Sequence, residues 1–152
     1  LGTAWMRSGG QLGTVSAELV RQQAAWTEQP AKFKTPDEFY LSTLRGLGAR
    51  SLRRRELRGV YASLGQAPFN APSPGGWPDE ETAWLGPDAV KKRLERSQAL
   101  PERPGQRVDP RVVLDGNLGA TAGQVPRRMV NGADSRPQGL TLALMSPEFQ
   151  RR

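Results

Sequence analysis

The sequence predicts an all-α fold, an irregular bundle of about six to eight short helices with a long, ordered Pro/Gly/Trp-rich loop in the middle. Two observations lead to this prediction. Apolar residues recur at three- and four-residue spacing, and the alternating pattern of a strand is missing. The 17 glycines and 13 prolines interrupt that spacing often, which favours short helices joined by irregular loops.

Two helices are expected at the N-terminal end of the chain. Residues 1–7 are typical of the last turns of a helix, which Ser8-Gly9-Gly10 ends with a glycine as a left-handed cap. A second helix is predicted over residues 12–25, because Leu12, Val15 and Leu19 give it one apolar face.

The next two helices precede the central loop. Thr35-Pro36-Asp37-Glu38 is the clearest local signal in the chain, with a capping threonine, a first-turn proline and the glutamate of a capping box. That helix is predicted to end near Leu47. Another is predicted over residues 51–64, with one apolar side and a second side rich in arginine.

The central loop, residues 65–84, cannot begin as a helix because its prolines remove backbone donors. Gly75-Gly76 predicts a tight reversal within it. Its three large rings, which belong to Phe69, Trp77 and Trp84, need a reason to remain in water.

The remaining elements follow the loop in short steps. Pro78-Asp79-Glu80-Glu81 predicts the start of a brief helix that Gly86-Pro87 ends. Residues 87–100 predict another helix, with Val90, Leu94 and Leu100 facing inward. Residues 101–110 are expected to form an internal flexible linker.

Three more helical segments are expected after that linker. Asp109-Pro110 predicts a capped helix. Another helical segment is expected from Thr121 to Asn131, although Pro126 removes a backbone donor within it. Ser135-Arg136-Pro137-Gln138 is a second capping box, and it opens the most apolar helix of the chain. Ser146-Pro147-Glu148-Phe149 begins a last turn.

The composition limits the chemistry that the chain can perform. Histidine and cysteine are absent, which removes the commonest general base, the commonest zinc ligand and any disulfide. The acids beside Asp79 are explained by capping, so no catalytic residue, cofactor or metal site is predicted. No apolar run approaches the roughly 20 residues of a membrane span.

Two groups of residues are the candidates for binding. The net charge is +7 and all but four of the 22 basic residues are arginine, which agrees with either codon bias or an anionic partner. The rings of the loop, with Asp79, could line a groove for a sugar or a proline-rich peptide, or could anchor the loop to the helices beneath. The candidates are Phe69, Trp77, Asp79, Trp84, Arg53, Arg54, Arg55 and Arg58.

Four segments carry a resemblance to a known family. Residues 32–39, 64–79, 83–85 and 144–150 resemble, in order and spacing, the C-terminal part of the bacterial family catalogued as domain of unknown function 1800. The resemblance implies a longer, largely helical protein that is periplasmic or exported. It transfers no catalytic residue.

We therefore expect residues 1–152 to form a single helical domain, a C-terminal fragment of a longer protein, because the chain starts without a methionine. A structural or partner-binding role is favoured, with the missing N-terminal half or another exported protein as partner. Two alternatives stay open. One is part of an enzyme active site completed by that half, and the other is a basic surface for nucleic acid or anionic lipid, although nucleic acid is the less favoured partner.

Overall fold

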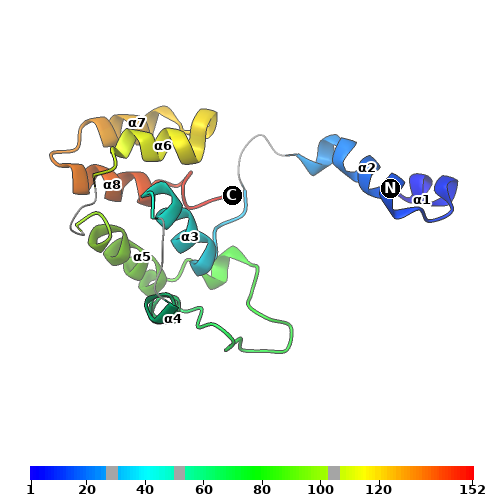
Figure 1. The fold of residues 1–152 in the computed structure, drawn as a ribbon, viewed down its shortest axis with the longest axis horizontal. Helices are drawn as coiled ribbons and strands as arrows, with labels where there is room; N and C mark the ends of the chain where they lie inside the picture. The colour runs from blue at the N-terminus through cyan, green and yellow to red at the C-terminus, as the bar shows by residue number, and fades with distance from the viewer. Residues whose placement is uncertain (27–30, 50–53, 103–106) are drawn as a thin grey trace. The chain divides into compact units, whose positions relative to one another are not determined.

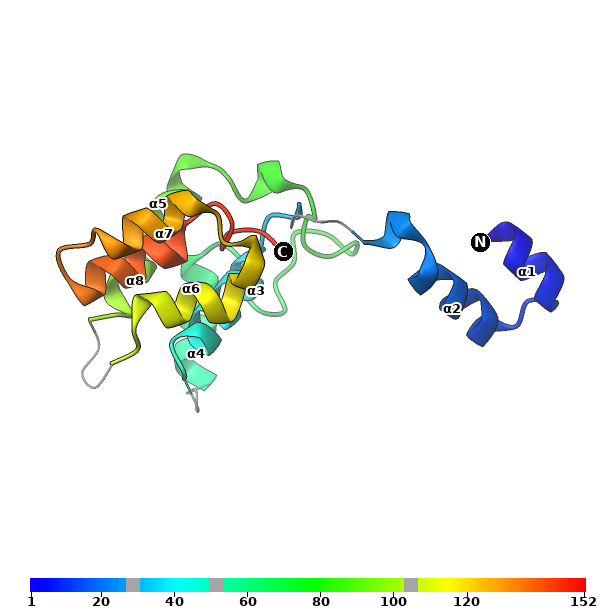
Figure 2. The same ribbon diagram turned by 90° about the horizontal axis from the view of Figure 1, so that it is seen from above.

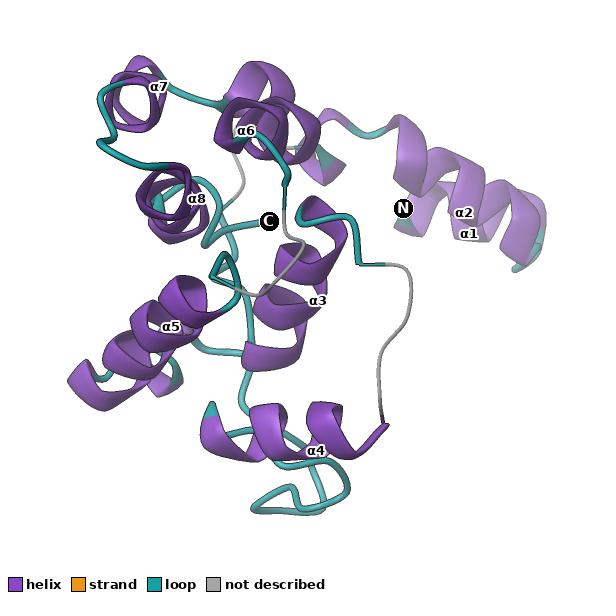
Figure 3. Ribbon diagram, turned by 60° about the vertical axis from the view of Figure 1, so that its left-hand side comes forward, coloured by secondary structure: helices purple, strands orange, loops and turns teal. Residues whose placement is uncertain are grey.

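The computed structural model of the protein describes residues 1–26, 31–49, 54–102 and 107–152. Over these ranges the fold is all-α, as predicted, with eight α-helices and three short 3₁₀ turns (Figure 1). Helices and loops make up the drawn ribbon (Figure 3), and the described extended segments meet in one isolated bridge, between Phe33 and Arg151. The chain divides into two compact units, Leu1–Ala31 and Lys32–Arg152.

Unit 1 is a helical hairpin. Helix α1 (Gly2–Ser8) packs on α2 (Leu12–Arg21), and Gly9 between them adopts the left-handed conformation predicted for the cap, with φ 61°. Helix α2 is shorter than predicted, because Gln22 is extended and Gln23–Ala25 form only a 3₁₀ turn. The indole N–H of Trp26 donates to the carbonyl oxygen of Val20 at 2.7 Å and closes this end of the hairpin.

Unit 2 is built around its last helix. Helix α8 packs against α5, α6 and α7, while α3 packs against α6. Figures 1 and 2 agree in placing α6, α7 and α8 side by side. The bounds of the six helices are α3 Pro36–Gly46, α4 Arg54–Ser63, α5 Pro87–Ala99, α6 Pro110–Leu118, α7 Gln124–Asn131 and α8 Arg136–Met145.

The core of unit 2 lies between these helices. The rings of Phe39 and Phe149 meet edge to face, with centroids 6.4 Å apart. Gly139 lets α8 approach the start of α6 closely, because a Cβ there would lie 2.9 Å from Pro110 Cγ. The fully enclosed apolar side chains are Phe39, Tyr40, Leu140, Ala143, Leu144 and Phe149.

The predicted caps are present. The Glu38 carboxylate accepts the N–H of Thr35 at 2.9 Å, which is half of the capping box at α3. Asp109 accepts the N–H of Arg111 at 2.8 Å and starts α6. Ser135 accepts the N–H of Gln138 at the start of α8, while the Gln138 side chain accepts from the residue before the cap, Asp134.

Two predicted helices differ from the observed ones. Residues 78–85 form no α-helix, and Glu81–Ala83 make only a 3₁₀ turn, because the acids there bind basic side chains instead of capping. Helix α7 begins at Gln124 rather than Thr121. Pro126 is then its third residue, where an N–H has no partner inside the helix and its loss does no harm.

Two predicted segments fall partly outside the described residues. The predicted helix start at Ser51 lies outside them, although α4 is present from Arg54 onward. Residues 103–106 also lie outside, so the flexible linker over residues 101–110 stays a prediction.

No helix of the described ranges combines the length and the hydrophobicity that are needed to cross a bilayer.

Helix α5 buries a face that its apolar pattern does not predict. Val90 and Leu94 were expected to face inward, yet both are exposed. Arg93 and Ser97 are buried in their place, and Leu100 is buried as predicted. The helix is therefore turned so that a cation enters the core.

The guanidinium group of Arg93 joins three separate segments. It donates to the Lys34 carbonyl oxygen at 2.6 Å and to Gln150 Oε1 at 2.8 Å. Its central carbon lies 4.5 Å from the ring centroid of Phe33 and 5.0 Å from that of Phe39. Burial lowers the pKa of Arg93 to about 10, so the group stays charged at neutral pH.

Replacing this cation should destabilise unit 2. Arg93→Met keeps the apolar stem but leaves two buried acceptors without a donor, so we expect the free energy of unfolding to fall by about 3 kcal/mol. Denaturant titration followed by circular dichroism measures the change. Lys91→Met on the same helix is the control, because Lys91 is exposed and makes only a long ion pair with Glu95. Equal stability of the two variants would contradict the role given to Arg93.

Candidate functional site

The central loop leaves α4 and returns to α5 through two β-turns. The N–H of Asn70 donates to the Ala67 carbonyl oxygen at 3.2 Å in the first turn. In the second turn the N–H of Gly76 donates to the Ser73 carbonyl oxygen at 3.0 Å, and this turn includes the reversal predicted at Gly75-Gly76. The loop is drawn in green in Figure 1, where its middle part extends away from the helices of unit 2.

Two of the three rings lie at the base of the loop. Trp84 is buried, and its indole N–H donates to the Pro78 carbonyl oxygen at 3.0 Å. Trp77 is half-buried against it, with ring centroids 6.1 Å apart. These two rings match the anchoring alternative, because they close the base of the loop rather than line an open groove.

Two ion pairs fasten the same base. Lys32 Nζ donates to Asp79 Oδ1 at 2.6 Å, and Arg151 donates from both terminal nitrogens to Glu81 at 2.5 and 3.0 Å. The hydrogen bond from Lys32 holds the pKa of Asp79 below its usual value, and the bond from Arg151 does the same for the pKa of Glu81. We call these two pairs, together with Trp84, the clasp.

Phe69 is not an anchor, and the prediction that all three rings could pin the loop is wrong for it. Its side chain has a relative exposure of 106%. Phe69 is also the only described non-glycine residue with a positive φ, 59°. It follows Pro68 in the first turn, at the position where a type II turn normally carries glycine. That geometry leaves the ring exposed, away from the core.

The structure places the arginine run only in part. Arg53 lies outside the described residues, and so does the side chain of Arg54. Arg55 and Arg58 are exposed on α4. A basic surface for nucleic acid therefore stays a prediction.

The two ends of unit 2 are paired beside the clasp. The N–H of Lys34 donates to the Gln150 carbonyl oxygen at 2.8 Å, and Lys32 and Arg152 exchange both backbone bonds, at 3.1 and 2.8 Å. Lys34 is buried, and its ammonium nitrogen lies 4.0 Å from the ring centroid of Phe149. Burial lowers the pKa of Lys34 to about 8, although Glu38 nearby opposes that shift.

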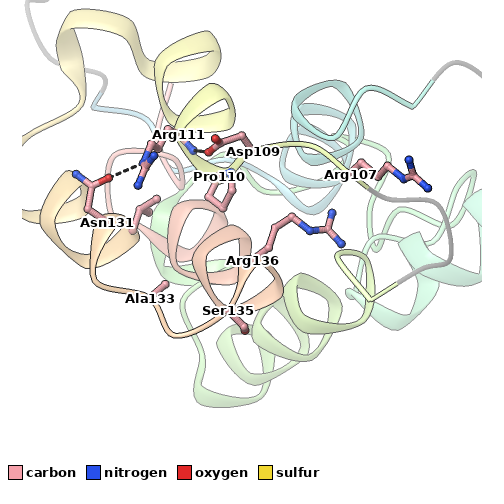
Figure 4. Close-up of a pocket in the computed structure, with 9 residues that line it drawn as sticks. Arg107, Asp109, Pro110, Arg111, Asn131, Ala133, Ser135 and Arg136 are labelled. Carbon is pink, nitrogen blue, oxygen red and sulfur yellow. Dashed lines mark hydrogen bonds between the residues drawn. The ribbon is translucent and has the colours of Figure 1, made fainter.

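A second candidate was missed by the sequence reasoning. A pocket of about 360 Å³ lies where the starts of α6 and α8 meet the end of α7 (Figure 4). Its nine lining residues come from two segments, residues 107–111 and 130–136, and none belongs to a motif that predicts binding. We call it the arginine pocket, and its lining residues are Arg107, Asp109, Pro110, Arg111, Val130, Asn131, Ala133, Ser135 and Arg136.

Comparison with known proteins gives one match. The family model described as "Protein of unknown function (DUF1800)" matches residues 1–151. No curated protein and no solved structure matches the chain.

Removing the charges of the clasp should loosen the loop without unfolding the unit. Asp79→Asn combined with Glu81→Gln removes both ion pairs, and exposed pairs of this kind contribute little to global stability. We expect faster hydrogen exchange of the Trp84 indole N–H, measured by NMR, with an unchanged melting transition. Glu95→Gln on α5, which removes an exposed acid outside the loop, serves as the control. Unchanged exchange would show that the ion pairs do not hold the loop.

The buried Lys34 should make stability depend on pH. Its pKa is about 8 in the folded chain and 10.5 when unperturbed, so the unfolded state binds more protons between these values. The free energy of unfolding should therefore rise as the pH increases from 8 to 10, by at most about 1.4 kcal/mol per pH unit. Denaturant titrations of the wild type and of Lys34→Met, which should lack this rise, measure it. Parallel pH profiles would contradict the assignment.

Proposed function

We propose that this chain, which belongs to the family described as protein of unknown function (DUF1800), is a partner-binding domain of an exported bacterial protein. In this proposal it presents residues 65–77 to another protein. The family match assigns no activity to the chain. The resemblance noted in the sequence supports export. The all-α architecture and the exposed loop support a binding role rather than a catalytic one.

The observation that carries the proposal is the state of Phe69. A phenyl ring with a relative exposure of 106% contributes nothing to the core of the folded chain. Its positive φ adds local strain on the order of 1 kcal/mol, because a side chain at this turn position is disfavoured. A residue that is both exposed and strained weakens the free protein. A partner with an apolar pocket for the ring would supply the compensating contact.

The base of the loop supports the same role. Trp84 and the ion pairs of the clasp fix the point where the loop returns, and the prolines limit the conformations that it can adopt. A loop that is already restricted loses less conformational entropy when it binds. The exposed Phe69 ring can therefore act as a preformed contact for a partner.

The alternative of a shared active site receives less support. It was built on Asp79, whose carboxylate is engaged by Lys32 and whose pKa is lowered by that bond. A general base or acid at neutral pH needs a pKa shifted toward 7, which is the opposite direction.

A photo-crosslinker at position 69 tests the proposal. We expect p-benzoylphenylalanine in place of Phe69, incorporated into the intact protein in its host, to form one discrete adduct that mass spectrometry identifies. The same group at Val125, which is also an exposed apolar residue on α7, is the control and should give no such adduct. The identified protein is then purified and its affinity for the domain measured.

Phe69→Gly should separate binding from stability. Glycine relieves the positive φ, so the free energy of unfolding should be equal or higher by about 0.5–1 kcal/mol. The affinity for the crosslinked protein should fall at least tenfold, as for an aromatic anchor at an interface. Retention of full affinity, or loss of folding, would each overturn the proposal.

A further inference from the structure

The arginine pocket combines a defined cavity with an excess of positive charge. Its volume of about 360 Å³ is within the range of small-molecule sites. Three of its nine lining residues are arginines and one is an acid, Asp109. One oxygen of that acid is already engaged by the N–H of Arg111 as the cap of α6. The pocket therefore has more cationic than anionic groups at its wall.

The three arginines are held by different elements. Arg111 lies in the first turn of α6, and its Nε donates to Asn131 Oδ1 at 2.8 Å, which fixes one side of the pocket (Figure 4). Arg136 is the first residue of α8, and Arg107 precedes α6. Figure 4 shows these two side chains extended on the other side of Pro110.

Several other arginines of the described chain are held by structural partners. Arg127 donates to Asp115 and to the carbonyl oxygens of Ala122 and Gly119. Arg93 and Arg151 are likewise committed to the core and the clasp. No comparable bond joins Arg107 to another of the described residues, and the bond from Arg111 to Asn131 uses its Nε.

We propose that the arginine pocket binds a small anion that carries a carboxylate or phosphate group on a compact, partly apolar body. Guanidinium groups bind both kinds of oxyanion through paired N–H donors. Pro110, Val130 and Ala133 supply the apolar part of the wall. The guanidinium groups and the cavity carry the inference, and the two helix starts beside them add a favourable dipole. The site is independent of the loop and of the function proposed for it.

Isothermal titration calorimetry of the full chain at low ionic strength tests the site. The probes are pyrophosphate for a phosphate ligand and citrate for a carboxylate ligand. We expect saturable one-to-one binding of at least one of them, and the tighter probe identifies the class. Arg107→Ala and Arg136→Ala should each weaken that binding about tenfold, which is the loss expected for one charge-assisted contact.

Arg21→Ala is the matched control, because it removes the same charge from an exposed position at the end of α2. Its affinity should equal that of the wild type within twofold. Circular dichroism is used to check that the three variants are folded. Arg136→Lys is a further variant that keeps the charge but loses the paired donors. The proposal would be overturned if neither probe bound at concentrations up to about 10 mM, which is enough to detect a millimolar dissociation constant. Equal weakening by Arg21→Ala would also overturn it.

Discussion

The cation of Arg93 is the constraint on which unit 2 depends. Its guanidinium group bonds the extended segment at Lys34 and the C-terminal segment at Gln150, and the rings of Phe33 and Phe39 lie against it. Taking this charge out of water is unfavourable, and the lowered pKa records that penalty. The acceptors and rings offset it only in this arrangement. The rotation of α5 about its own axis is therefore set by Arg93. That rotation in turn determines how the elements that contact α5 pack against it.

The sequence predicted those features that depend on neighbouring residues. Capping is local, so the starts of the helices at Thr35, Asp109 and Ser135 could be foreseen from a few letters. The buried face of α5 could not, because the acceptors that draw Arg93 inward come from residues 34 and 150, and the apolar spacing favoured Val90 instead. The arginine pocket escaped for the same reason, since its wall is assembled from three helix ends.

The central loop separates stability from recognition along one short stretch. Its base is closed by Trp84 and by charges on residues from both ends of unit 2, whereas Phe69 in its first turn carries an exposed ring. Sequence reasoning recognised the loop as ordered and aromatic but could not divide these roles. The division follows from Pro68, which sets a turn whose next residue projects outward. The arginine pocket uses different elements and opposite chemistry, so the two surfaces can evolve separately.

The pairing between residues 32–34 and 150–152 has a mechanical consequence. The two segments run antiparallel and their outer ends meet, so a tensile load applied to Lys32 and Arg152 would act on one pair of hydrogen bonds at a time. Such a junction peels open at low force. Two pairs further in, the load reaches Lys34 and Gln150, which are the partners of Arg93. Pulling on the ends of unit 2 would therefore transmit force directly into its core.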